Sequence, residues 1–166
     1  MKKTLAVTLV LLIVVYAGLA FVGIDPKDRR PGTRLSGATT PLPDDWSFTA
    51  DYAEVALETR PWYGIPFSVT VVVGESGGRL FVPSLYETEA EFPGTKYWNK
   101  VVARNPNVRL RVGERLFELA VHPIRDEAQF QFAQAALAAK YPSWGDRTDT
   151  ARPRKYALLE LKPRAR

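Results

Sequence analysis

The sequence starts with two lysines and then runs without a charged residue from Thr4 to Ile24. As an α-helix rising about 1.5 Å per residue, this run would be about 30 Å long, which is the thickness of a bilayer hydrocarbon core. A helix in a soluble core would carry a polar stripe, whereas this run offers only Thr4, Thr8 and Tyr16. We therefore predict that residues 1–24 enter a membrane, either as a transmembrane anchor or as a signal segment.

Retention of this segment and its orientation are separate questions. A signal segment needs small residues at its cleavage site, and Gly18-Leu19-Ala20 provides them. The apolar run is longer than a signal requires, which favours an uncleaved single-pass anchor whose residues 4–24 contact lipid. The first lysines favour a cytoplasmic N-terminus, whereas the basic residues of 27–34 favour a cytoplasmic domain. Because the short basic start resembles bacterial export signals, we expect the domain on the non-cytoplasmic side.

The segment after the apolar run has the composition of a linker. Residues 25–45 contain four prolines and almost no large apolar side chain, which predicts an extended, solvated tether. Such a tether would place Arg29, Arg30 and Arg34 within reach of lipid phosphates.

The rest of the chain is the right size for one domain. Residues 46–163 are numerous enough to build a single core, and residues 164–166 form the end of a basic tail. The net charge of +5 is spread along the chain and lies in no nucleic-acid-binding motif. We therefore expect no nucleic acid partner.

Alternating and β-branched segments predict a mainly antiparallel β domain. The segment 52–59 alternates apolar and acidic residues, and 67–73 is nearly continuous in apolar residues, as in a strand buried on both faces. Gly74–Gly78 is typical of a turn leading into strand 79–82, and 156–161 would be the last strand. With two covering helices, these hairpins predict a small closed or half-open barrel.

The two predicted helices have different signals. A short helix starts near Trp98 and ends before Asn105-Pro106, because a proline disfavours helical geometry in the residue before it. A longer helix runs from an Asp126 cap to about Lys140, with apolar residues at helical spacing.

An arginine-rich hairpin lies between these helices. A two-residue turn at Gly113-Glu114 sets apolar pairs on one face and Arg109 opposite Glu118 on the other. In this register Glu118 is the expected ion-pair partner of Arg109, and Arg111 has no acidic partner. A solvated sheet face and an anion-binding surface remain as alternatives for Arg111.

The chain lacks several residues on which common catalytic sites depend. It has no cysteine and a single histidine, His122, so a thiolate nucleophile and a zinc site of several nitrogen and sulfur ligands are excluded. There is no Gly-x-Ser-x-Gly turn, and Gly74–Gly78 lacks the Lys-Ser/Thr of a phosphate-binding loop. We expect no metal and identify no catalytic side chain. An enzyme built on this chain would rely on an organic cofactor.

Three segments, taken with the order of the expected elements, resemble the flavin-binding split β-barrel superfamily. They are LETRPWYGIPFSVTVVV (57–73), GRLFVPS (78–84) and YWNKVVARNPNVRLRVGERLFE (97–118). The similarity is greatest to its deazaflavin-dependent nitroreductase-like and pyridoxamine 5'-phosphate oxidase-like branch, and it covers roughly residues 46–141. The resemblance implies an antiparallel split β-barrel that binds FMN or a deazaflavin coenzyme in a groove, often across a homodimer interface, and serves as a redox protein.

The candidate cofactor-binding residues lie in or next to these segments, and their side chains can contact a phosphate or a ring. Lys96 precedes the start of a helix, and the free backbone N–H groups there favour an anion. In the alternative, Thr95 is the N-cap of that helix and Lys96 is solvated. Trp98 would border a cofactor ring or face the core. The hydroxyls of Ser68 and Thr70 would donate to a ring or phosphate, or pair across strands. The expected contacts are Arg60, Ser68, Thr70, Lys96, Trp98, Asn99 and Arg111.

One turn departs from the family pattern. Arg60 matches a family arginine, but the basic run that usually follows it is replaced by Pro61–Pro66, which contains Trp62 and Tyr63 and no cation. These aromatics suit an interaction surface, a lid over a pocket or a plug in the barrel end. Contact with a different ligand, stacking on a ring and contact with the membrane are further alternatives. Two functions follow: a membrane-anchored flavin- or deazaflavin-dependent oxidoreductase that reduces a nitro compound or quinone, and a non-enzymatic module that binds a hydrophobic ligand or membrane partner.

Overall fold

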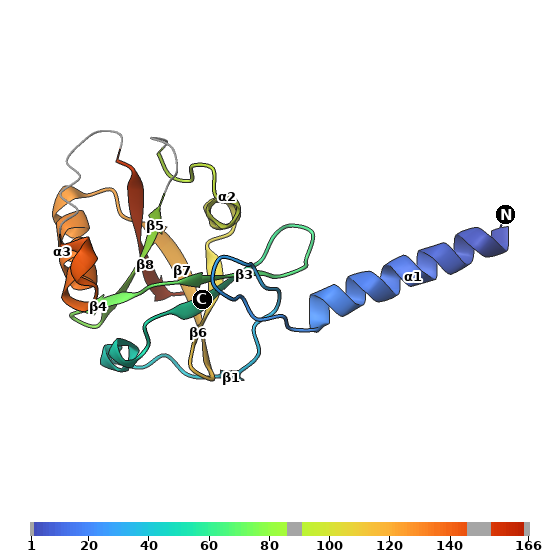
Figure 1. Ribbon diagram of the computed structural model, residues 1–166, viewed down its shortest axis with the longest axis horizontal. Coiled ribbons are helices and arrows are strands. Elements are labelled where there is room, and N and C mark those ends of the chain that lie inside the picture. Colours follow the sequence, from blue (N-terminus) through green and yellow to red (C-terminus); the bar gives the residue numbers. More distant parts are fainter. Residues whose placement is uncertain (1, 86–90, 146–153, 165–166) are drawn as a thin grey trace.

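The computed structural model describes residues 2–85, 91–145 and 154–164 and shows a helix projecting from a β domain (Figure 1). Helix α1 (Lys2–Phe21) leads into a chain segment that folds back onto the domain. The part Lys3–Phe21 is long and apolar enough to cross a membrane, and none of it is buried in the protein. The apolar N-terminal helix predicted from the sequence is therefore present.

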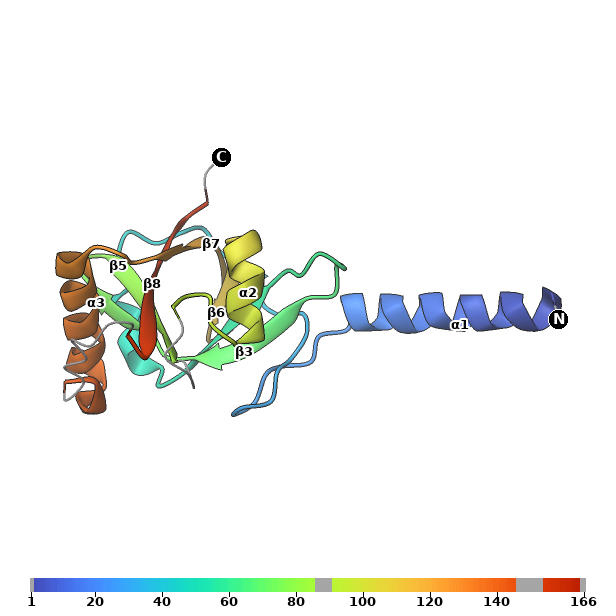
Figure 2. The same cartoon turned by 90° about the horizontal axis from the view of Figure 1, so that it is seen from above.

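The strands form one curved sheet. Seven of them follow a hydrogen-bonded path in the order β3-β2-β6-β7-β8-β5-β4, and β1 joins by pairing with β7. Neighbours along the path are antiparallel, whereas β1 and β7 are parallel. The sheet curls into a half-barrel (Figures 1 and 2), which confirms the predicted split-barrel class. The strands are β1 (Ala38–Thr39), β2 (Val55–Thr59), β3 (Phe67–Val71), β4 (Gly74–Ser76), β5 (Arg79–Leu85), β6 (Asn107–Val112), β7 (Arg115–Pro123) and β8 (Tyr156–Pro163).

Two helices cover different parts of the barrel (Figure 2). Helix α2 packs on β2 and β3, and α3 packs on β4, β5 and β8. Asp126 caps α3 as predicted, because its side chain accepts a hydrogen bond from the backbone N–H of Gln129 at 2.9 Å. The helical elements of the domain are α2 (Tyr97–Arg104), α3 (Glu127–Lys140) and the short 3-10 turns η1 (Ser47–Asp51) and η2 (Pro142–Trp144).

Alternation along the strands places the apolar side chains in a core inside the barrel. Leu57, Leu110 and Phe117 of three neighbouring strands are almost fully buried there. A second cluster, around Phe81 and Leu137, lies under α3. Burying one such side chain stabilises the fold by about 1.5–3 kcal/mol, so these two clusters hold the hairpins together and fix α3 to the sheet.

Two strand expectations need correction. The predicted turn Gly74–Gly78 contains β4, and the turn itself is Gly77-Gly78, whose φ angles of 59° and 73° suit glycine. Strand β3 is not buried on both faces as expected. It ends the sheet path and is mostly half-buried, so one edge of its backbone is left for another segment to pair with.

Arg109 and Glu118 lie opposite each other as predicted, but they are not the ion pair. The guanidinium of Arg109 instead donates two hydrogen bonds to Glu58 of β2, the other neighbour of β6. The Glu58 side chain is 2% exposed and that of Arg109 is 12% exposed, whereas Glu118 is half-exposed and pairs with Arg164 at 3.0 Å. The hairpin pattern could not indicate this ion pair, because Glu58 lies in β2, 51 residues before Arg109 in the sequence.

The expected solvated tether also packs on the barrel. Residues 25–36, here called the strap, lie along the exposed edge of β3 (Figure 2). Gly32 and Ser68 exchange backbone hydrogen bonds of 2.9 and 3.0 Å. Leu35 is 1% exposed, and its backbone N–H donates to the carboxylate of Glu58 at 2.7 Å. The strap thus satisfies an unpaired strand edge, which a solvated tether would leave open.

Neutralising Glu58 is expected to destabilise the protein strongly. Glu58→Gln leaves the Arg109 guanidinium buried without a counter-charge, which costs about 3 kcal/mol in the free energy of unfolding. The matched control Glu118→Gln removes the exposed carboxylate opposite Arg109 and should cost less than about 1 kcal/mol. Denaturant unfolding of the full chain in detergent measures both losses. Equal losses, or a greater loss for Glu118→Gln, would contradict the observed pairing.

Candidate functional site

The strap and α2 enclose the pocket that best matches the predicted site. This pocket, here called the α2 pocket, has a volume of about 520 Å³. It lies between the strap, the strands β3 and β5, and the start of α2. Its lining residues are Asp28, Arg29, Arg30, Pro31, Val69, Thr70, Leu85, Lys96 and Trp98.

The α2 pocket combines positive charge with an aromatic wall. Among the described lining residues, Arg29, Arg30 and Lys96 contribute three cations and Asp28 contributes one carboxylate. Lys96 is the N-cap residue of α2, so the alternative in which Thr95 is the cap is wrong, and no side chain in the described part of the protein caps that helix. The positive end of the helix dipole therefore adds to the lysine charge. This arrangement suits an anion such as a phosphate.

Trp98 faces the core, which is one of the two interpretations that the sequence allowed. It is 6% exposed and packs in the barrel core, and it also forms part of the α2 pocket wall. Thr70 of β3 lines the same pocket. The structure thus brings together three of the predicted residues, Thr70, Lys96 and Trp98.

Arg111 lies beside this pocket and has a partner. Its guanidinium donates to Asp25 of the strap at 2.6 Å and to the Ser36 hydroxyl at 3.4 Å. It lines a neighbouring pocket of about 350 Å³, which shares Asp28 and Thr70 with the α2 pocket. The partner missing from the hairpin register is therefore supplied from 86 residues earlier in the sequence.

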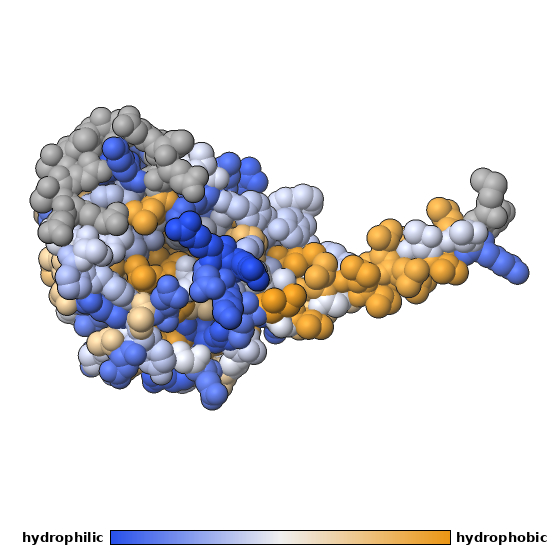
Figure 3. All heavy atoms as spheres, viewed as in Figure 1, coloured by the Kyte–Doolittle hydropathy of each residue, from blue (hydrophilic) through white to orange (hydrophobic). Residues whose placement is uncertain are grey.

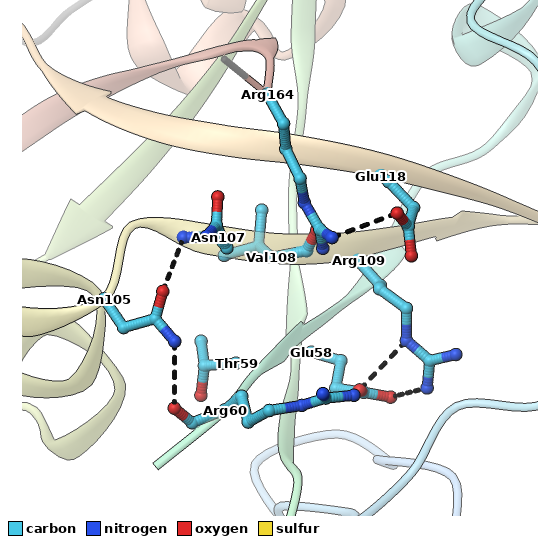
Figure 4. A pocket seen from close by; sticks show the side chains of 9 residues that line it. All are labelled: Glu58, Thr59, Arg60, Asn105, Asn107, Val108, Arg109, Glu118 and Arg164. Atoms are coloured by element: carbon cyan, nitrogen blue, oxygen red, sulfur yellow. Dashed lines mark hydrogen bonds and ion pairs between the residues drawn. The ribbon is translucent and has the colours of Figure 1, made fainter. Parts of the chain in front are cut away.

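Arg60 lies in a different place from the other predicted residues. It lines a pocket of about 180 Å³, shown in Figure 4, that has no residue in common with the α2 pocket. Its side chain is exposed, and its backbone carbonyl accepts a hydrogen bond from Asn105 at 3.5 Å. Glu58, Arg109, Glu118 and Arg164 line the same pocket, and these four charged side chains are engaged in the ion pairs of the barrel.

Two predicted residues are buried away from these pockets. Asn99 is fully buried and exchanges two hydrogen bonds with Ser84, at 2.8 and 2.9 Å, which ties α2 to β5. Ser68 is also fully buried, and its hydroxyl has no hydrogen-bond partner within the described part of the chain. It lies beneath Gly32, where an added Cβ would come within 2.7 Å of the Ser68 hydroxyl oxygen.

The turn Pro61–Pro66 does not plug the barrel. Trp62 is 89% exposed, and its ring lies edge-on to that of Tyr63. The hydroxyls of Tyr63 and Tyr97 are 2.8 Å apart and share a hydrogen bond. Burial, together with this hydrogen bond, raises the pKa of Tyr63 to about 12.

Sequence reasoning missed the strap as a source of site residues. The sequence placed Arg29 and Arg30 within reach of lipid phosphates but did not indicate that both line the α2 pocket. Their charge was visible in the sequence, but nothing local indicated that the strap folds back to β3. Among the described ranges, no group of three or more metal-ligating side chains comes together.

Comparison with known proteins identifies the fold. No family model matches the chain, and no curated protein is significantly similar to it. A protein of Bacteroides thetaiotaomicron, provisionally assigned to 5-nitroimidazole antibiotic resistance, superposes with a TM-score of 0.53 at 13% identity and covers 83% of this chain and 90% of its own. A protein of Listeria innocua, provisionally assigned as a pyridoxamine 5'-phosphate oxidase, gives 0.52 at 13% identity, with coverages of 72% and 90%.

A third similar structure has another role. The haem storage protein HutZ of Vibrio cholerae superposes with a TM-score of 0.52 at 13% identity and covers 76% of this chain and 93% of its own. At identities this low, the similarity shows a shared fold, and function has to be inferred from the site. The chain therefore has the split-barrel fold that its sequence resembles, and that fold is compatible with more than one ligand.

Substituting Gly32 is expected to loosen the strap. A Cβ there would lie 2.1 Å from the carbonyl oxygen of Ile24 and 2.7 Å from the Ser68 hydroxyl, so Gly32→Ala forces the backbones apart. If this costs about 1–2 kcal/mol, tryptic cleavage after Arg34 should accelerate about 5–30-fold. The control is Gly18→Ala, which meets nothing within 4 Å. Limited proteolysis of the full chain in detergent gives the rates, and equal rates for both variants would contradict the strap packing.

Proposed function

We propose that the protein is a membrane-anchored split-barrel redox protein that binds FMN or a deazaflavin coenzyme in the α2 pocket. It would pass reducing equivalents to a small organic acceptor of the nitro or quinone class. The observation that carries the proposal is the pairing of cations with an aromatic wall in one pocket of this fold. A phosphate-bearing ring compound needs both features.

The residues of the α2 pocket fit such a cofactor. Lys96 and the start of α2 would hold the phosphate, with Arg29 and Arg30 adding charge from the strap. Trp98 would flank the ring, and the Thr70 hydroxyl would hydrogen-bond to it. When bound, the cofactor supplies the hydride or electron chemistry, and the chain contributes binding and orientation. This division of roles agrees with a sequence that has no cysteine and no Gly-x-Ser-x-Gly turn.

The membrane anchor is part of the same proposal. Helix α1 would span the bilayer once, with the domain on the non-cytoplasmic side, and a quinone acceptor would be available in the surrounding lipid. The resemblance to the flavin-binding split barrels also leads us to propose a homodimer.

A second candidate function is a non-enzymatic module for a hydrophobic ligand or membrane partner. The observation that favours it is the turn Pro61–Pro66, which replaces the basic run of the cofactor-binding relatives with exposed aromatics. In this case the α2 pocket would bind no flavin-type compound.

A binding titration separates the two functions. Full-length protein in detergent is titrated with FMN and, separately, with a deazaflavin coenzyme, and cofactor fluorescence is followed. Saturable binding that weakens about 10–100-fold in Lys96→Ala is expected, because one charge-assisted hydrogen bond contributes about 1.5–3 kcal/mol. Lys100→Ala removes an exposed lysine one turn further along α2 and should bind as the wild type does.

The remaining outcomes are also informative. No binding of either compound by a folded protein would overturn the redox proposal and leave the binding module. Equal losses in Lys96→Ala and Lys100→Ala would mean that general charge, rather than the α2 pocket, holds the cofactor. Weaker cofactor binding in Arg60→Ala alone would show that the phosphate is held in the pocket of Figure 4 and not in the α2 pocket.

A further inference from the structure

The turn Pro61–Pro66 contacts the apolar helix within the helix's own length. The hydroxyl of Tyr16 in α1 donates a hydrogen bond to the backbone carbonyl of Tyr63 at 2.8 Å. Gly64, with a φ of 85°, lies so close that an added Cβ would be 2.7 Å from the Tyr16 hydroxyl oxygen. This close approach fixes the turn against the side of α1 and not beyond its end.

The exit of α1 is also held by hydrogen bonds. The Thr33 hydroxyl of the strap donates to the carbonyl of Val22 at 3.0 Å and accepts from the N–H of Ile24 at 2.9 Å. Helix, strap and turn are therefore joined at one place, where the apolar surface of α1 meets the domain (Figure 3). The domain is attached to α1 by these contacts as well as by the covalent chain.

The position of Tyr16 sets the depth of the turn relative to a bilayer. Tyr16 precedes the helix end at Phe21 by five residues, which is about 8 Å along an α-helix. Helix α1 is about as long as the hydrocarbon core, and each interfacial layer adds only several ångströms to that core. If α1 spans the bilayer, the turn lies within about 8 Å of the level at which α1 leaves the hydrocarbon core, near the border between hydrocarbon and headgroups.

The side chains of the turn have the chemistry of that layer. Trp62 is 89% exposed to solvent, and Tyr63 beside it is 36% exposed. Tryptophan and tyrosine concentrate at membrane interfaces, where the ring body is apolar and one edge forms hydrogen bonds. The strap joins this junction through Thr33 and also carries the exposed cations Lys27, Arg29 and Arg30. Such cations complement anionic headgroups.

We propose that the turn Pro61–Pro66 is a second membrane contact, with Trp62 inserted into the headgroup layer beside α1. The domain would then rest on the bilayer in a fixed orientation and would not hang from a flexible tether. This inference rests on the membrane anchoring proposed for α1, and it is independent of whether the α2 pocket binds a cofactor.

Tryptophan fluorescence tests this contact in the full-length protein. The chain has four tryptophans, and Trp46, Trp98 and Trp144 are each at most 7% exposed, so a contact quencher reports mainly on Trp62. The protein is reconstituted in phosphatidylcholine–phosphatidylglycerol vesicles whose acyl chains carry bromine near the headgroup. Flotation of the vesicles first shows whether the protein is membrane-bound. Quenching by bromine and by aqueous iodide, present on both sides of the membrane, is then compared.

The expected result is quenching by brominated lipid that is lost in Trp62→Phe. A matched control adds Phe132→Trp to that variant. Phe132 is a 40% exposed aromatic on α3, and α3 lies on the side of the barrel away from α1 (Figures 1 and 2). The tryptophan introduced there should be quenched by iodide and not by brominated lipid.

Three results would overturn the proposal. Flotation with Trp62 quenched by iodide alone would leave the anchor intact and show that the turn faces water. Flotation with Trp62 shielded from both quenchers would mean that a second copy of the protein, and not lipid, covers the turn. Failure to float would remove both the anchor and the contact.

Discussion

The buried ion pair between Glu58 and Arg109 is the interaction on which the rest of the architecture depends. Burying two charges costs several kcal/mol per ion unless each one is fully hydrogen-bonded. Here Arg109 donates twice to Glu58, and the Glu58 carboxylate also accepts from the backbone of Leu35. Arg109 in turn donates to the Leu35 carbonyl at 3.3 Å. The pair therefore cannot be satisfied by the barrel alone, because it requires the strap.

This requirement explains why a proline-rich segment becomes part of the fold. Once Leu35 is fixed at the ion pair, the residues before it are brought to the open edge of β3, where Gly32 pairs with Ser68. Glycine is needed at position 32 because any side chain there would collide with the Ser68 hydroxyl. The wall of the α2 pocket, including Arg29 and Arg30, follows from the same placement. The pocket is therefore a product of the strap as much as of the barrel.

What the sequence could and could not predict follows from the range of each interaction. The register that sets Arg109 opposite Glu118 depends on a two-residue turn, and the Asp126 cap depends on its own helix, so both were predictable. The true partners of Arg109 and Arg111 lie 51 and 86 residues away, and alternation along one strand carries no signal about them. Lys96 and Trp98 are close in the sequence, so they could be placed near each other. The strap cations Arg29 and Arg30 could not be assigned to the same pocket, because they are distant in the sequence.

The turn Pro61–Pro66 and the strap together suggest how this chain departs from the family it resembles. The basic run expected after Arg60 is missing, and two of the three cations of the α2 pocket, Arg29 and Arg30, come from the strap that follows α1. The turn instead contacts α1 through the backbone carbonyl of Tyr63 and exposes Trp62. On the proposed function, anchoring and ligand binding would then be coupled, because displacement of the strap would remove Arg29 and Arg30 from the pocket and break the hydrogen bonds of Thr33 to Val22 and Ile24.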